Sequence, residues 1–352
     1  MFNYATGPVE MTEAEVHALG SGPPNSHMAD GQALIADTLR TLRQVLRVPD
    51  EFDLFMMPGS IRQALDVVMS VAAEPTGEVV ALSTGYWGEF IADLLRNHVG
   101  AQRVTSVTSL EGVGAESVAL VTAVHMETET GQMQPLGELA RFRSAGARTL
   151  VDAACTLPTH DLDYDLADII VLGSHKCLGG PAGLGIVLVR KDMPLIGDWT
   201  VEAYRADGVA RAAGHSLPTP LVTYPIQVVA ALRSAIDRLL DPEAAQRRFA
   251  AARHLRDELS RRGFAVWATE AASSTVTRVD LAAEIDVDAF RSSLAAQGYF
   301  VIGNVGASSG GSIRIGTMSD PQVDKGNLDR LLDALEQARA ATSPLDTEGA
   351  ST

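Results

Sequence analysis

Cysteine is scarce in this chain. The 352 residues include only two cysteines, Cys155 and Cys177, and both lie in apolar stretches. Two thiols are too few for a framework of disulfides or for a zinc site built from cysteines. Their number is typical of a protein that folds in a reducing compartment, so we expect a cytoplasmic location.

Positive charge and long apolar runs are also in short supply. Lys and Arg number 28 against 44 Asp and Glu, which gives a formal net charge of −16. Binding to a phosphate backbone needs clustered cations, so this balance argues against a nucleic-acid partner. No apolar run approaches the ~20 residues that span a bilayer. The N-terminal stretch MFNYATGPVEMTEAEV lacks the basic and apolar regions of a secretory signal. We therefore expect no membrane partner.

Short, continuous apolar runs are what the chain has instead. Runs that do not alternate with polar residues predict a sheet that is buried on both faces. Stretches with helical spacing lie between them, which predicts an α/β fold with a doubly wound, mostly parallel seven-stranded sheet. The predicted strands are DLFMM (53–57), EVVALS (78–83), QRVTSV (102–107), VALVTAV (118–124), RTLVDA (148–153), DIIVLG (168–173) and LGIVLVR (184–190).

The pattern changes near residue 240. Residues 243–262 predict a charged helix, and the short strands and helix that follow it are typical of an α+β fold. We expect a large domain over residues 1–240, including the N-terminal segment, and a small C-terminal domain over 241–340. The polar tail at 341–352 is predicted to be disordered.

Lys176 and Asp152 are the first candidates for catalysis. Both lie at the carboxyl ends of predicted strands, where open α/β sheets bind their ligands. A lysine in apolar surroundings loses hydration of its charged form, which makes the neutral amine more available to form a Schiff base. A carboxylate nearby can keep the pyridine nitrogen of pyridoxal phosphate (PLP) protonated. Taken singly, Lys176 can also be a snorkelling side chain and Asp152 the cap of a turn.

Three further motifs follow predicted strands. Ser60 opens a predicted helix, whose free N–H groups attract an anion such as phosphate, although Ser60 is equally suited to be a plain N-cap. Trp87 can stack on a flat heteroaromatic ring or belong to the core. In HMETETGQMQPL (125–136), Thr128 can bond a ring hydroxyl or belong to an ordinary polar loop. The His-x-Glu pair there has no third ligand at a diagnostic spacing, so we expect no metal.

The order of these motifs, together with SHKCLGGPAGLGIVLVRKDM (174–193), resembles the class V aminotransferases, which are PLP enzymes of fold type I. The stretches FNYATGP, LRQVLRVPDEFDLFMMPGS, TGYWGEF and GGPAGLGIVLVRKDM are similar to phosphoserine aminotransferase. The stretches HMETETGQMQPL and VDAACTL are similar to the alanine–glyoxylate and serine–pyruvate group. The resemblance covers roughly residues 1–320 and implies a large PLP-binding domain followed by a small C-terminal domain.

The resemblance also implies a role for individual residues. Lys176 is expected to form the Schiff base and to move the proton between the substrate α-carbon and the cofactor. Asp152 is expected to pair with the pyridine nitrogen, Trp87 to stack on the ring, and Thr128 to contact its hydroxyl oxygen. Arg314, in GGSIRIGTM, matches the arginine that binds the substrate carboxylate. The expected phosphate contacts are Ser60, Ile61, Arg62, His175 in place of the usual Gln, and Thr219 of the neighbouring subunit, while a contact from Ser216 stays open.

The predicted function is transfer of an amino group between an α-amino acid and a 2-oxo acid by a two-fold homodimer. One alternative is a PLP lyase acting at the β-carbon, such as a C–S lyase or a desulfurase-like enzyme. Cys155 and Cys177 flank cofactor residues, which disfavours a version that forms a persulfide on a mobile cysteine. The other alternative is a catalytically silent binding module, which the presence of both Lys176 and Asp152 disfavours.

Two departures from the family pattern bear on the substrate. Met28 follows His27 where the family usually has His-Arg, and VGAS (305–308) stands near the His-Arg of the phosphoserine enzyme. Both arginines that would meet a substrate phosphate are missing at these places. The sequence therefore predicts poor turnover of phosphoserine.

Overall fold

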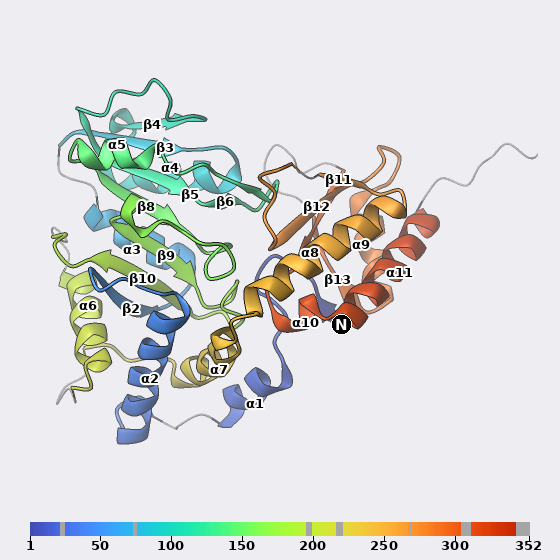
Figure 1. Ribbon diagram of the computed structural model, residues 1–352, viewed down its shortest axis with the longest axis horizontal. Coiled ribbons are helices and arrows are strands. Elements are labelled where there is room, and N and C mark those ends of the chain that lie inside the picture. The colour runs from blue at the N-terminus through green and yellow to red at the C-terminus, as the bar shows by residue number, and fades with distance from the viewer. Residues whose placement is uncertain are drawn as a thin grey trace, which may run out of the picture.

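A seven-stranded sheet forms the centre of the larger part of the molecule (Figure 1). The computed structural model describes residues 1–21, 25–72, 76–194, 199–215, 221–267, 269–303 and 311–342. The strand order is β2-β10-β9-β8-β5-β3-β4, and neighbours are parallel except that β10 runs antiparallel to β2 and β9. The bounds are β2 Phe52–Pro58, β3 Glu78–Leu82, β4 Val104–Val107, β5 Val118–Val124, β8 Arg148–Asp152, β9 Ile169–Gly173 and β10 Leu184–Arg190. All seven predicted strands are present, and the predicted fold class is confirmed.

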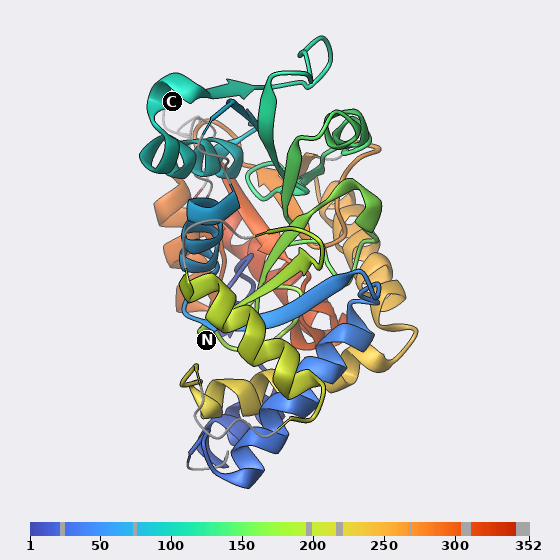
Figure 2. The ribbon, with the colours of Figure 1, turned by 90° about the vertical axis from the view of Figure 1, so that its left-hand side faces the viewer.

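Helices cover both faces of this sheet, as Figure 2 shows. Side chains of α2, α5 and α7 join one apolar core, and those of α3 and α4 join another. In β9, Ile170 and Leu172 belong to the first core, whereas Ile169 and Val171 belong to the second. This two-sided burial explains why the strands are apolar along their whole length. The helices are α1 Glu13–Ser21, α2 Ala29–Val45, α3 Ile61–Ala72, α4 Tyr86–Val99, α5 Leu139–Ser144, α6 Trp199–Ala212 and α7 Ile226–Asp237.

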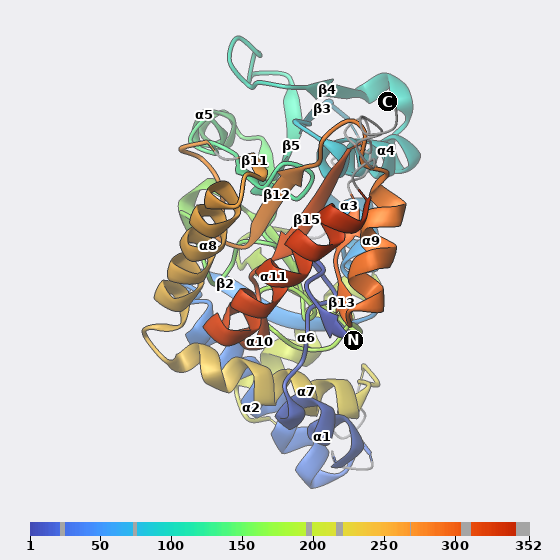
Figure 3. The ribbon, with the colours of Figure 1, turned by 90° about the vertical axis from the view of Figure 1, so that its right-hand side faces the viewer.

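A four-stranded antiparallel sheet, in the order β11-β12-β15-β14, forms the smaller part (Figure 3). It has an apolar core of its own, which includes Leu255, Phe290 and Leu331 from three helices. The elements are α8 Ala244–Arg261, β11 Ala265–Trp267, β12 Val276–Asp280, α9 Val287–Ala296, β14 Ile302–Gly303, β15 Ser312–Gly316, α10 Asp320–Val323 and α11 Lys325–Thr342.

The first residues of the chain join this smaller part. β1 (Phe2–Asn3) pairs in parallel with β13 (Tyr299–Phe300), and Figure 1 marks the N-terminus beside these elements. Tyr4 is fully buried in the small-domain core. The predicted large domain of residues 1–240 included this segment. The structure differs there because the Tyr4 ring is buried among side chains of the C-terminal part.

Short elements complete the description. β6 (Met126–Glu127) pairs with β7 (Gln132–Met133), and 3-10 turns occur at Ala101–Arg103, Tyr164–Leu166 and Arg238–Leu240. Within the described ranges, no helix has the length and apolar character needed to cross a membrane. Most of the tail that was predicted to be disordered, residues 343–352, lies outside the described residues.

Candidate active site

Four of the predicted residues meet at the carboxyl edge of the large sheet. Trp87 lies in the first turn of α4 after β3, Thr128 follows β5 and β6, Asp152 ends β8, and Lys176 follows β9. Because β3, β5, β8 and β9 are parallel, their carboxyl ends lie at one edge. The residues that line one narrow cavity there are Ile61, Trp87, Val124, Met126, Thr128, Asp152, Ala154, Cys155 and Lys176.

Asp152 contributes a buried carboxylate to this cavity. It is 7% exposed, and its Oδ1 accepts a hydrogen bond of 2.9 Å from the Ala154 N–H. Burial raises the pKa of Asp152 to about 6, and the Ala154 N–H and the Lys176 ammonium oppose that rise. A carboxylate removed from water in this way is stabilised by a cationic partner. The protonated pyridine nitrogen of PLP is a partner of that kind.

The side chain of Lys176 is held by the backbone of the N-terminal segment. Its Nζ donates a hydrogen bond of 2.8 Å to the carbonyl oxygen of Thr6. The same nitrogen lies 6.0 Å from the centroid of the Trp87 ring. An amine in this position can reach a ring that stacks on Trp87.

A single hydroxyl links the aromatic residue to the predicted substrate-binding arginine. Trp87 Nε1 donates to Thr128 Oγ1 at 2.7 Å, and Arg314 Nη1 donates to the same oxygen at 3.1 Å. Arg314 comes from β15 of the small domain, so the site combines residues of both domains. The structure thus brings together the residues predicted to contact the cofactor ring and the substrate carboxylate.

Arg314 is a buried cation. It is 5% exposed, and its Nε and Nη2 donate to the Gly303 carbonyl at 3.3 and 3.0 Å. Burial lowers the pKa of Arg314, while Cys155 and Glu129 act in the opposite direction. Among the ion pairs of the described residues, none joins Arg314 to a carboxylate. The guanidinium can therefore bind the carboxylate of a ligand.

The first turn of α3 forms the predicted phosphate end of the site. The Ser60 N–H donates to Gln63 Oε1 at 2.7 Å, and the Gln63 N–H donates to Ser60 Oγ at 3.3 Å, which makes a reciprocal cap. The next N–H groups, of Ile61 and Arg62, have no partner inside the helix and suit an anion. The Arg62 guanidinium lies 5.0 Å from the Trp87 ring centroid, so its side chain packs on the aromatic platform.

His175 lies beside this helix start. A Cβ added to Gly173 would lie 3.0 Å from His175 Cε1 and 3.4 Å from Ile61 Cβ, so ring and helix are neighbours. The Nδ1 atom of His175 is buried and has no hydrogen-bond partner. Burial lowers the pKa of His175 to about 4. A neutral imidazole can offer an N–H here, and the orphaned nitrogen fits the phosphate of PLP.

Glu127 is a site residue that was not predicted. Its carboxylate accepts hydrogen bonds from the Gly88 N–H at 2.7 Å and the Trp87 N–H at 3.2 Å. Burial raises the pKa of Glu127 to about 7, and these two N–H groups oppose that rise. The carboxylate caps α4 and so positions Trp87. The only sequence signal is indirect, because Gly85 stands at the N-cap of α4 and offers no capping side chain.

Some predicted positions cannot be compared with the structure. Thr219, Ser216 and the segment at 305–308 lie outside the described residues. Met28 is described, and its side chain is exposed at the start of α2.

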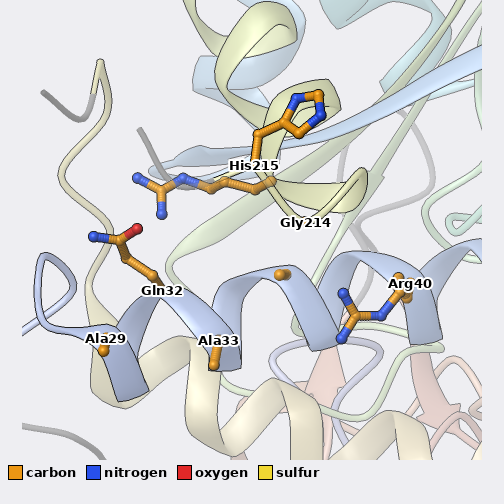
Figure 4. A pocket seen from close by; sticks show the side chains of 8 residues that line it. Ala29, Gln32, Ala33, Arg40, Gly214 and His215 are labelled. Atoms are coloured by element: carbon orange, nitrogen blue, oxygen red, sulfur yellow. The ribbon is translucent and has the colours of Figure 1, made fainter. Parts of the chain in front are cut away.

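A larger hollow, of about 430 Å³, lies between α2 and the end of α6 (Figure 4). Gln32 and Arg40 line it from α2, and His215 lines it from the opposite side. None of the predicted site residues that the structure describes is among its lining residues. The candidate active site is therefore the cavity at Lys176.

Solved structures share this fold over almost its whole length. Pyridoxamine–pyruvate aminotransferase from Mesorhizobium loti has a TM-score of 0.85 over 97% of this chain and 92% of that chain, at 21% identity. Alanine–glyoxylate aminotransferase from Nostoc sp. has a TM-score of 0.81 over 96% of this chain and 94% of that chain, at 24% identity. At such identities the likeness establishes the fold alone.

Sequence relatives cover smaller shares of the chain. An uncharacterized aminotransferase of Methanocaldococcus jannaschii is 27% identical over 198 residues, which are 53% of this chain and 51% of that protein. This chain therefore matches about half the length of that relative. A 2-aminoethylphosphonate–pyruvate transaminase of Bacteroides fragilis is 24% identical over 304 residues, or 78% of this chain and 81% of that protein.

Lysine and aspartate lie at successive strand ends of this sheet, beside an aromatic face and a helix start with free N–H groups, an arrangement that suits a PLP enzyme of fold type I. The family model of the class-V aminotransferases matches residues 29–308. The chain belongs to the class-V aminotransferase family, and its cofactor is pyridoxal phosphate. The family predicted from the sequence is confirmed.

Proposed function

We propose that this protein transfers an amino group between an α-amino acid and a 2-oxo acid. The observation that carries the proposal is Arg314, a buried guanidinium whose hydrogen bonds go to Thr128 and to a backbone carbonyl. A substrate carboxylate would supply its missing countercharge through two parallel hydrogen bonds. Arg314 is bonded to Thr128, which lines the same cavity as Lys176, so a small substrate can lie between the two cations.

The predicted site residues would divide the tasks of this reaction among them. When bound, PLP supplies an aldehyde that combines with amines and a ring that accepts electrons. Lys176 Nζ would act as the general base that takes the proton from the substrate α-carbon. The same group would later give this proton back as a general acid. Asp152 would keep the pyridine nitrogen of the cofactor protonated, and Trp87 would offer its ring for stacking. The N–H groups of Ile61 and Arg62, together with Ser60 and His175 Nδ1, would hold the phosphate.

The acceptor that the relatives favour is a small 2-oxo acid. Two of the relatives named above use pyruvate, and a third uses glyoxylate. For the donor, we propose an unphosphorylated amino acid, because this chain has Met28 at the position where the resemblance to the family implies an arginine.

Half-reactions test this function. Cofactor-loaded protein is mixed with alanine, serine, glutamate or phosphoserine in the absence of a 2-oxo acid, and the visible band of the cofactor is followed. We expect at least one unphosphorylated amino acid to discharge the band faster than phosphoserine does. Release of pyruvate and ammonia from serine would instead identify a lyase, and no response to any donor would refute amino transfer.

We further infer that the protein is a two-fold homodimer. α1, α2, α6 and α7 pack against one another at one end of the molecule. Large apolar side chains are exposed at this end, namely Val16, Met28, Val209 and Leu221. Exposed apolar side chains on neighbouring helices favour an interface, and a two-fold contact would bury both copies alike.

We also infer a cytoplasmic location. Cys155 and Cys177 are both free and buried, and a thiol without a disulfide partner is typical of proteins in reducing compartments. Their burial likewise disfavours either cysteine as the mobile carrier of a desulfurase.

A further inference from the structure

The N-terminal strap, which we define as residues 3–9, connects the two parts of the molecule. Tyr4 is buried in the small-domain core, whereas Val9 is buried in a core of the large domain. The Gly316 N–H, at the end of β15, donates to the Tyr4 carbonyl at 2.7 Å. At the other end, the Val9 N–H donates to the His175 carbonyl at 3.2 Å. Figure 3 shows the strap in dark blue beside β13.

Gln322 holds the small-domain end of the strap. This side chain is fully buried and comes from α10. Its Oε1 accepts the N–H groups of Met318 and Ser319 at 3.0 and 3.3 Å. Its Nε2 donates to the carbonyls of Asn3 and Ala5, both at 3.0 Å. A primary amide has two donor hydrogens and two acceptor lone pairs, so Gln322 uses its full capacity on these four backbone groups.

The next residues of the strap lie directly against the catalytic lysine. The Thr6 carbonyl accepts the hydrogen bond of 2.8 Å from Lys176 Nζ. Gly7 has a φ of +113°, and a Cβ at this position would overlap Cδ and Cε of Lys176. The backbone is therefore packed against the lysine with no room for a side chain.

The geometry points to the strap as a positioning element for Lys176, with Gln322 as the residue that positions it. In this proposal, the Thr6 carbonyl is the resting acceptor of the Lys176 amine whenever that amine is not joined to the cofactor. Gln322 fixes the position of the Thr6 carbonyl relative to the cavity. The proposal rests on the function proposed above, in which Lys176 must be free to move protons.

A lysine side chain has several rotatable bonds, so a free amine samples many positions. A fixed acceptor limits these positions and keeps Nζ near the Trp87 ring, where the reacting carbon would lie. Since Gly316 on β15 is bonded to the same strap, a shift of the strand that carries Arg314 also shifts the Thr6 carbonyl. The strap thus couples the substrate-binding arginine to the catalytic lysine.

Gln322→Glu is the selective test of this proposal. A carboxylate can still accept from Met318 and Ser319, but it has no N–H to donate to Asn3 and Ala5. Gln297→Glu is the matched control, because Gln297 Nε2 donates to two carbonyls of the small domain, Ser293 and Ala334 at 3.3 Å each, and not to the strap. Gly7→Ala is a second variant, whose methyl group would meet Cδ and Cε of Lys176 and so disturb the contact between strap and lysine without touching Gln322.

The first measurement is the chemical reactivity of Lys176 in the cofactor-free full chain. The sequence has three lysines, Lys176, Lys191 and Lys325, and the exposed Lys191 serves as the internal reference. Brief reductive methylation at fixed pH is followed by mass spectrometry of the peptides. We expect the labelling of Lys176 relative to Lys191 to rise severalfold in Gln322→Glu and in Gly7→Ala, and to stay unchanged in Gln297→Glu.

The second measurement uses the loaded enzyme. In Gln322→Glu we expect kcat to fall about tenfold or more, because the amine is no longer held in place. The KM for the amino acid should stay within about twofold, since Arg314 keeps its own contacts. A purely structural role would leave the Lys176 label unchanged.

Unchanged labelling in both strap variants, or an equal rise in Gln297→Glu, overturns the proposal. If Gln322→Glu fails to fold, the Gly7→Ala result alone decides. The labelling does not depend on turnover. An inactive wild-type protein that still shows the expected labelling pattern would refute amino transfer and leave the role of the strap supported.

Discussion

Arg314→Ala is the substitution that tests the site most directly. The guanidinium is 5% exposed and bonded to Thr128 and the Gly303 carbonyl, so its loss leaves a buried polar pocket without a cation. Truncating one partner of a buried, hydrogen-bonded charge pair costs about 2–4 kcal/mol. Because 1.4 kcal/mol corresponds to a factor of ten, kcat/KM for an amino acid should fall by roughly 30- to 1,000-fold.

The assay compares kcat/KM for one unphosphorylated donor across three variants. Arg314→Lys should also be impaired, because an ammonium cannot offer two parallel N–H groups to a carboxylate. Arg278→Ala is the matched control. Arg278 faces Arg314 across β12 and β15 and forms an ion pair of 2.8 Å with the partly exposed Asp280. Removal of a pair of this kind should cost about 0–1 kcal/mol.

The reasoning is refuted if Arg314→Ala loses no more than Arg278→Ala. It is also refuted if the loss in Arg314→Ala comes entirely from loss of the cofactor, which the visible band of the purified variant reports. A full effect with the cofactor still bound would assign the substrate carboxylate to Arg314.

Four further predictions can be checked separately. Borohydride reduction of the loaded protein should fix the cofactor on Lys176, and a label on Lys191 or Lys325 in the peptide map would contradict this assignment. Asp152→Asn should stabilise the cofactor-free chain at pH 7 by roughly 3 kcal/mol, because the pKa of Asp152 is raised from 3.8 to about 6. The ionised carboxylate destabilises the fold progressively as the pH rises from 4 to 6, so urea unfolding should show the gain above pH 6 and none below pH 4. Thr128→Val should weaken both cofactor and donor binding by about 1–3 kcal/mol, because the indole and the guanidinium lose their shared acceptor; unchanged dissociation constants would argue against the link. Sedimentation should find a dimer at working concentration, and a fully active monomer would contradict the proposed interface.

Much of the large domain could be predicted from its residues because each strand is packed on both faces. In β10, Ile186 and Leu188 belong to one core, and Val187 and Val189 belong to the other. The strand is therefore a continuous apolar run, a pattern that predicts burial on both faces of a sheet. Lys176 and Asp152 could be located for a related reason. The carboxyl ends of parallel strands share one edge whatever the intervening helices do.

Contacts between distant segments could not be predicted in this way. Thr128 and Arg314 are 186 residues apart, and Gln322 reaches Asn3 across 319 residues. No local pattern records such a pairing. The N-terminal segment illustrates the same limit, because a single buried aromatic residue, Tyr4, gives no periodic signal that would assign it to the small domain.

The direction in which a side chain points could not be predicted from the local sequence either. The start of α3 was predicted as a phosphate site from its free N–H groups, and those groups belong to the backbone. The Arg62 guanidinium instead lies over the rings of Trp87 and Phe90, at 5.0 and 4.7 Å from their centroids. The positions of these rings depend on how α4 follows its strand, which the sequence around α3 does not specify.

The hydroxyl of Thr128 has only one hydrogen atom and two lone pairs. Both lone pairs are occupied, one by the indole N–H of Trp87 and the other by the guanidinium of Arg314. Its single hydrogen can therefore only be given away. The Thr128 hydroxyl can therefore form a hydrogen bond with a ligand atom that accepts one, but not with an atom that can only donate. An ionised oxygen on the cofactor ring can accept this hydrogen bond, whereas an ammonium group, which has no lone pair, cannot.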